Sequence, residues 1–279
     1  MDAVFGMLSL QPKTLTVDAT AGGSYFGNSG TRYIFYGGSF MTASGATVTG
    51  NVDIQVTEYL QKGDMIFSKM LPISNGAPLI SGGEINVLAT QNGQPVYLKT
   101  HNLFVANLPQ PGTPDTAMNF FASTPNLDTT TIKTNWLPIA KDTSHYNVKI
   151  VVGSGDTLTM FSDSMKLCNA DHFMTSYSYQ NFTLAITMSG SPAVSSNAIY
   201  AYALYDNYKG AWPVHSVGSE NSFSVDHVPC IPVHFAVFTL NKGVFYGGVT
   251  GATPVTGSTY TIDLTEQEPF AFKNLINGL

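Results

Sequence analysis

The stretch Asn51-Val52-Asp53-Ile54-Gln55-Val56 alternates polar and apolar residues. Because successive side chains of a β-strand point to opposite faces of a sheet, this period of two places Val52, Ile54 and Val56 on one face. The stretch Glu84-Ile85-Asn86-Val87-Leu88-Ala89 follows nearly the same pattern. Two half-buried strands are therefore expected here, and they indicate a β fold.

The period of two continues on both sides of these stretches. Asn92-Gly93 and Lys242-Gly243 each separate two apolar runs, and Asn-Gly tolerates the positive φ angles of a tight hairpin. Two hairpins are therefore expected. Further strands are expected at 31–36, 146–152, 157–161, 181–187, 198–205, 233–239, 243–247 and 258–263.

Helical periodicity is confined to the C-terminal run 268–277. Pro269 suits the first turn of a helix that starts near Glu268, and Gly278 suits the position after the last turn. Two pairs of apolar residues spaced i,i+4 are expected to form its apolar face, namely Ala271/Leu275 and Phe272/Ile276. The chain is thus expected to be all-β with one short C-terminal helix.

The stretch 108–116, Leu-Pro-Gln-Pro-Gly-Thr-Pro-Asp-Thr, contains three prolines, which lack the N–H groups that a central strand needs. We therefore place a domain division here, and the length of 279 residues agrees with about two domains. The expected parts are a β-sandwich domain over 1–107, a Pro/Thr-rich connecting segment packed on the domains over 108–145, and a second, immunoglobulin-like β-sandwich domain over 146–279 that includes the helix.

The composition excludes several classes of protein. Charged residues make up 11% of the chain, the net charge is -6, and Arg32 is the single arginine, so nucleic-acid binding is not expected. Disorder is excluded by a hydrophobic content of 43%. The sequence has no apolar stretch long enough to span a membrane and no signal peptide at Met1–Phe5. Its Thr, Ser, Asn, Gly and Tyr content suits an extracytoplasmic chain from which an export signal has been removed.

Three glycine-containing motifs resemble the opening of ZU5-like domains. They are Gly30-Thr31-x-x-Ile34, Gly38-Ser39-Phe40 and Gly45-x-x-Val48-Thr49-Gly50-Asn51-Val52, followed by Glu58-Tyr59, Lys62-x-Asp64-Met65 and the stretch 79–84. The resemblance covers about 30–100 and is greatest to ZU5-like domains of secreted or lipid-anchored Bacteroidetes-type proteins. It implies a β-sandwich scaffold and transfers no catalytic activity.

Residues suited to catalysis or metal binding are few. Cys168 and Cys230 belong to no CxxC pair, which leaves two buried thiols, a disulfide between them, or a reactive thiol as alternatives. Asp171-His172 and Asp226-His227 place a carboxylate beside an imidazole, but neighbouring side chains of a strand point to opposite faces. The chain also lacks the nucleophile elbow and phosphate-binding loops. We expect no catalytic residue, no metal and no cofactor.

Aromatic residues gather between positions 177 and 212. Tyr177 and Tyr179 are expected on one strand face, Tyr205 and Trp212 follow the next predicted strand, and Tyr208 is expected at the exposed tip of the loop 206–210. Such rings either fill a pleated, half-buried surface or bind a glycan or an envelope protein.

The composition, the resemblance and these aromatic residues together favour one function over its rival. We expect a non-enzymatic extracytoplasmic structural or binding module of a bacterial cell envelope, in the periplasm, anchored at the outer membrane by a lipid, or at the cell surface. It would recognise its partner through exposed aromatic residues or strand edges. The alternative is a hydrolase whose site is assembled from distant loops.

Overall fold

The computed structural model describes residues 1–125, 133–139, 148–175, 177–188, 199–206, 208–214, 221–252 and 256–279. Strands dominate these residues, which confirms the expected all-β class. The helices among them are α1 (Asp2–Leu8), α2 (Lys62–Ser68) and α3 (Pro269–Asn277). None of these described helices combines the length and the apolar character needed to cross a bilayer.

Two sheets are built from the first 173 residues. The first has the order β1 (Lys13–Asp18), β5 (Asn51–Tyr59), β7 (Ala77–Gln91), β14 (Leu167–Phe173), β10 (Asn119–Pro125) and β11 (Thr134–Pro138), with β6 (Ile73–Ser74) and β8 (Gln94–Leu98) paired to β7, and β4 (Phe40–Thr42) paired to β8. The second has the order β12 (Lys149–Val152), β13 (Thr157–Ser162), β9 (Phe104–Pro109), β3 (Arg32–Tyr36) and β2 (Gly22–Phe26).

The two sheets bury one core between them. Val52, Ile54 and Val56 of β5 all lie in this core, which confirms the face predicted from their alternation. Phe35 and Phe104 reach the same core from β3 and β9 of the second sheet, and their rings stack at 5.8 Å. The period of two was therefore sufficient to predict which side chains of β5 face inward.

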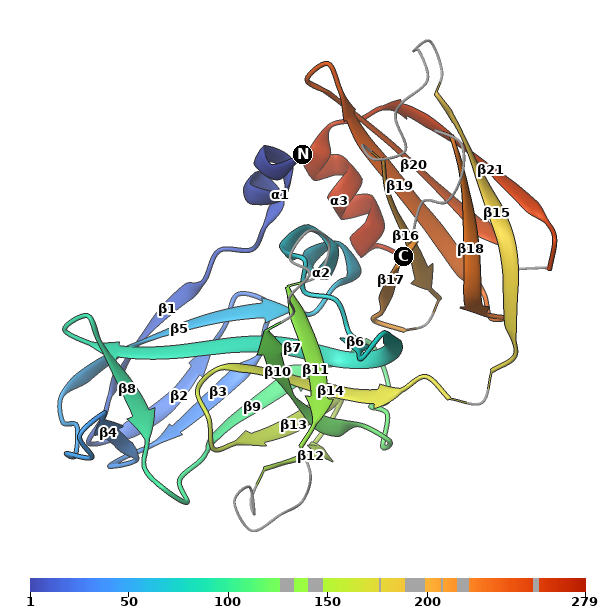
Figure 1. Cartoon of the computed structure of the whole chain (residues 1–279). Helices are drawn as coiled ribbons and strands as arrows, with labels where there is room; N and C mark the ends of the chain where they lie inside the picture. Colours follow the sequence, from blue (N-terminus) through green and yellow to red (C-terminus); the bar gives the residue numbers. More distant parts are fainter. Residues whose placement is uncertain are drawn as a thin grey trace.

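The third sheet is built from the last hundred residues. Its order is β17 (Ala211–Val214), β16 (Ile199–Tyr205), β19 (Val233–Asn241), β20 (Val244–Ala252), β21 (Thr259–Glu266), β15 (Tyr179–Met188) and β18 (Ser222–Pro229). The pairing of β15 with β21 is parallel, and the other neighbours are antiparallel. Figure 1 shows this sheet beside the three helices, apart from the first two sheets.

The three helices pack together against one face of the third sheet. Phe5, Phe67 and Phe272, one from each helix, lie in the same apolar cluster as Phe238 of β19. The opposite face of β19 carries Phe235, which belongs to the main core, so this strand is buried on both faces. In the chain, α2 lies between β5 and β6, which both belong to the first sheet. Since α2 packs on the third sheet, it connects the first sheet to the third (Figure 1).

The hairpins and the C-terminal helix agree with the sequence patterns. Asn92 and Lys242 both have positive φ between the paired strands β7/β8 and β19/β20. Glu268 caps α3 by accepting a hydrogen bond from the Phe270 N–H, and Pro269 occupies the first turn. The predicted apolar face of α3 was only half correct, because Phe272 and Ile276 are buried whereas Ala271 and Leu275 are exposed.

The strand pairing groups the chain differently from the predicted segments 1–107, 108–145 and 146–279. The first sheet joins β7, β10 and β14, which come from all three segments. The proline-rich stretch connects β9 of the second sheet to β10 of the first, so it crosses between two sheets that share a core. Pro109 is the last residue of β9, and Pro111 and Pro114 lie in the connection to β10. Positions 126–132 and 140–147 of these segments, and position 198 of a predicted strand, lie outside the described residues.

Candidate functional site

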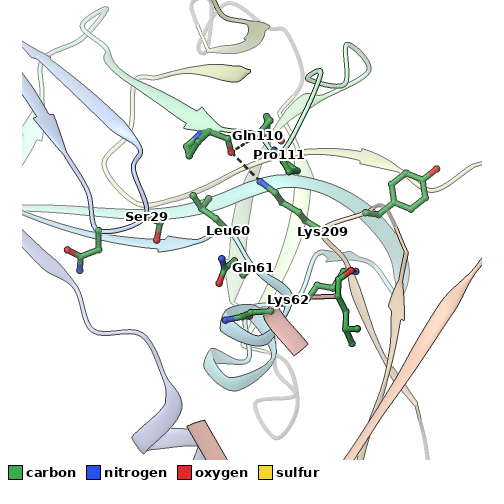
Figure 2. Close-up of a pocket in the computed structure, with 13 residues that line it drawn as sticks. Ser29, Leu60, Gln61, Lys62, Gln110, Pro111 and Lys209 are labelled. Carbon is green, nitrogen blue, oxygen red and sulfur yellow. Dashed lines mark hydrogen bonds between the residues drawn. The ribbon is translucent and has the colours of Figure 1, made fainter. Parts of the chain in front are cut away.

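A pocket of about 690 Å³ opens where the first sheet, α2, the C-terminal residues and a loop of the third sheet meet. This volume lies within the range of roughly 300–1,000 Å³ typical of small-molecule sites. Figure 2 shows Gln61 between Lys209 and Lys62 in this pocket. Its lining comprises Asn28 and Ser29, residues 60–62, residues 109–111, Tyr208 and Lys209, and residues 277–279.

A buried carboxylate fixes the wall formed by the β2–β3 connection. Glu58 Oε2 accepts a hydrogen bond from the Ser29 N–H at 2.8 Å, and Oε1 accepts one from the Thr31 N–H at 3.1 Å. A Cβ at Gly27 would collide with this carboxylate, so glycine is required for the close approach. Glu58 is therefore occupied in holding the loop and does not line the pocket.

Lys209 brings the third sheet into contact with the first. Its Nζ donates hydrogen bonds to the carbonyl oxygens of Gly82 at 3.3 Å and Pro109 at 3.4 Å. Lys209 also forms a β-bridge with Ser81 of β7. Gln110 Nε2 donates to the same Gly82 oxygen at 2.8 Å, so both side chains converge on one carbonyl. Burial lowers the pKa of Lys209 to about 8.

Lys62, the first residue of α2, supplies the second ammonium group of the pocket. Its Nζ donates to the main-chain oxygen of Leu279 at 3.1 Å. Burial lowers the pKa of Lys62 to about 8, and the negative charge of Asp206 partly opposes this effect. The described lining residues include two lysine side chains and no aspartate, glutamate or histidine side chain.

The five predicted aromatic residues do not form one exposed strip. Tyr208 lines the pocket, and its hydroxyl lies 2.9 Å from that of Tyr177, which precedes β15 instead of sharing its face with Tyr179. Tyr179 is 44% exposed. Tyr205 is buried in the main core, and Trp212 is half-buried between two apolar clusters.

The burial of Tyr205 and the partial burial of Trp212 match the alternative that such rings fill a pleated, half-buried surface. A period of two shows which strand residues share a face, but it does not show whether that face is open or covered. The loop carrying Tyr208 and Lys209 was expected to be exposed, yet both residues are half-buried because the loop packs on β7. The structure brings the hydroxyls of Tyr177 and Tyr208 together, and Tyr179 lies close enough to Tyr205 to help raise its pKa.

The sequence did not single out the two lysines as site residues. In the sequence, Lys62 belongs to the motif Lys62-x-Asp64-Met65 that resembles ZU5-like domains. Lys209 belongs to the loop 206–210, which was expected to be exposed. No local pattern joins them, because they meet through the packing of the third sheet on the first.

Ionisable side chains of the described residues also gather outside the pocket, for example in the Asp206–His234 pair at 3.3 Å. His172 Nε2 is 2.9 Å from Asp115 Oδ2 at the surface, so its carboxylate partner is not the neighbouring Asp171. Glu84 and Asp171 are fully buried, and Asn169 Nδ2 donates a hydrogen bond to each. Burial raises the pKa of both carboxyl groups, which are closed off from solvent.

The cysteines do not form the suggested disulfide. Cys168 is a buried thiol 3.4 Å from Ser162 Oγ, and burial raises its pKa to about 12. In the part of the chain that the structure describes, no group of three or more His, Cys, Asp or Glu residues is placed to hold a metal ion. The side chain of His227 lies outside that part.

Comparison of the chain with protein-family models and with curated protein sequences gives no match. The resemblance to ZU5-like domains therefore remains a prediction from the motif residues. Function has to be argued from the chemistry of the site, since one fold can carry many functions.

Proposed function

We propose that this chain is a non-enzymatic binding module of a bacterial cell envelope and that its pocket holds a saccharide. The observation that carries this proposal is a cavity of about 690 Å³ lined by amides, a hydroxyl, a tyrosine and two lysines. The proposed setting is extracytoplasmic, with an export signal removed and a lipid anchor in the unprocessed chain. ZU5-like or immunoglobulin-like sandwich domains remain our proposal for its finer architecture.

The lining chemistry supports a saccharide as the ligand. Sugars present many hydroxyl groups, which amide and hydroxyl side chains such as Asn28, Ser29 and Gln61 can bind as donors or acceptors. Tyr208 adds an aromatic ring, and rings of this kind pack on the apolar faces of sugars. Pro109 and Pro111 add further apolar surface.

The same lining gives no support to a hydrolase. General acid–base catalysis by a side chain at neutral pH commonly uses a histidine or a carboxyl group within hydrogen-bond reach of the substrate. Neither type occurs among the described residues that line the pocket. Glu84 and Asp171 are fully buried, and the residues of the Asp115–His172 and Asp206–His234 pairs do not line the pocket.

An array of immobilised oligosaccharides tests the proposal. The unmodified chain is expected to bind members of the array, and Tyr208→Ala is expected to weaken that binding at least ~10-fold, or about 1.4 kcal/mol. Tyr97→Ala is the matched control, because Tyr97 is 46% exposed on β8 and does not line the pocket. The proposal fails if no oligosaccharide binds, or if both variants bind as the unmodified chain does.

A further inference from the structure

The pocket is lined by two ammonium groups, and among the described residues no side-chain carboxylate forms an ion pair with either of them. Lys209 Nζ has two neutral carbonyl oxygens as its hydrogen-bond partners. Lys62 is 6% exposed and donates to the main-chain oxygen of Leu279. Removing an ammonium group from water is unfavourable unless hydrogen bonds and an opposite charge compensate it.

Another lysine of the same region shows how the fold compensates such a charge when the role is structural. Lys273 of α3 is 8% exposed, similar to Lys62. Its Nζ lies 2.7 Å from Asp64 Oδ1 and donates to the Leu8 carbonyl at 2.8 Å. The ion pair is closed within the helix cluster, so Lys273 needs no further partner.

The position of the two pocket lysines suggests where the missing charge comes from. Both belong to the described lining of one cavity, which contains no acidic side chain. A ligand with an anionic group would supply charge-assisted hydrogen bonds that the protein does not supply itself. The lowered pKa values of both ammonium groups agree with incomplete compensation.

We infer that the pocket selects saccharides that carry an anionic group and that the positive charges of Lys62 and Lys209 attract this group. The inference rests on the proposed function, because it names the class of saccharide that the same pocket takes. Lysine is a compact point charge without the planar fork of arginine, so the anionic group can be a carboxylate or a sulfate.

The net charge of the whole chain favours a small anionic sugar as the ligand. The chain as a whole carries a net charge of -6, so an extended polyanion would be repelled outside the pocket. The amides and Tyr208 would then bind the sugar's neutral hydroxyls and ring face, while the lysines bind its charge.

The test uses the full chain and an array with neutral, uronate-containing and sulfated oligosaccharides at equal density. The chain is detected with an antibody, because chemical labelling would modify lysines. Binding is expected to uronate or sulfate members, at least ~10-fold tighter than to neutral members of the same length. For a uronate that binds, the methyl ester is expected to lose this advantage, since the ester removes only the charge.

Variants assign the effect to the pocket. Lys209→Met and Lys62→Met are expected to abolish the preference for the acid over its methyl ester. Lys242→Met, in the exposed β19–β20 hairpin, is expected to keep it. Thermal unfolding curves verify that each variant is folded before binding is compared.

Two results would overturn the inference in different ways. Equal binding of acid and ester, or binding of neutral members alone, overturns the anion selectivity and leaves the saccharide-binding function standing. Binding to no member of the array overturns both proposals. A preference that Lys242→Met loses as fully as Lys209→Met also contradicts the inference, because the charge effect would then lie outside the pocket.

Discussion

Lys62 and Lys273 are buried to the same degree, in two neighbouring regions that differ in how they treat a positive charge. In the helix cluster, Lys273 meets Asp64 of α2 at 2.7 Å. At the start of the same helix α2, Lys62 faces a pocket without an acidic side chain in its described lining. The short helix α2 thus contributes an internal ion pair on one side and, on the other, an ammonium group that hydrogen-bonds a main-chain oxygen and has no side-chain ion pair among the described residues. The first arrangement serves stability, and we attribute the second to ligand binding.

The largest effect is expected from breaking the ion pair. Asp64→Asn leaves the Lys273 ammonium buried with neutral oxygen acceptors and without the opposite charge that Asp64 supplies. Removing one member of a buried pair costs roughly 3–5 kcal/mol, so the free energy of unfolding should fall by that amount. Denaturant titration measures it, with Glu266→Gln at an exposed position as control. A loss below about 1 kcal/mol would contradict a structural role for the pair.

A smaller effect is expected from forcing α2 and α3 apart. A Cβ at Gly63 would lie 2.6 Å from Asn277 Oδ1 and 2.8 Å from the Lys273 carbonyl oxygen. Gly63→Ala should therefore destabilise the chain by about 1–3 kcal/mol. The matched control is Gly6→Ala in α1, where a Cβ meets no atom within 4 Å and alanine should be neutral or slightly stabilising. Equal destabilisation by both changes would argue against close contact of the helices.

The strands could be predicted from the sequence, whereas the site could not. The reason is that a strand pattern lies within a few consecutive residues, but the site is formed by residues far apart in the chain. The alternation at 51–56 lies within one strand, so sequence alone predicted which side chains are buried. All seven residues of α2 are buried, so it lacks the polar face by which helical periodicity is detected. The pocket depends on contacts among Lys62, Lys209 and Leu279, which distant segments bring together.

Substitution of a pocket lysine should change the free energy of unfolding in the opposite direction from Asp64→Asn. Lys62→Met or Lys209→Met removes a buried charge, so the free energy of unfolding at pH 7 should stay unchanged or rise by about 1 kcal/mol. Because burial lowers both pKa values to about 8, the unfolded chain binds more protons between about pH 8 and pH 10.5. The unmodified chain should therefore gain stability over this range relative to each variant.

Other ionisable groups lie near these lysines, and their contribution to the pH dependence of stability must be distinguished from that of the lysines. Asp206 acts on Lys62 from the third sheet, and Glu58 lies behind the pocket wall. Glu84 and Asp171 have raised pKa values and lose stabilisation as the pH rises, which is the opposite sign. These groups are present in both chains, so the difference between variant and unmodified chain isolates the lysine. Parallel pH curves for the two chains would contradict the prediction.

The smallest effect is expected from changing Tyr208, which lines the pocket and hydrogen-bonds Tyr177. The hydrogen bond to Tyr208, together with burial, raises the pKa of Tyr177 to about 12. Tyr208→Phe removes this partner, so the pKa of Tyr177 should fall towards 10, and unfolding should become easier by about 0.5 kcal/mol. Titration of tyrosinate absorbance, compared with Tyr97→Phe, measures the shift. Because phenylalanine keeps the ring, saccharide binding should survive in Tyr208→Phe but not in Tyr208→Ala. Loss of binding in both would show that the hydroxyl is required and would contradict binding through the ring alone.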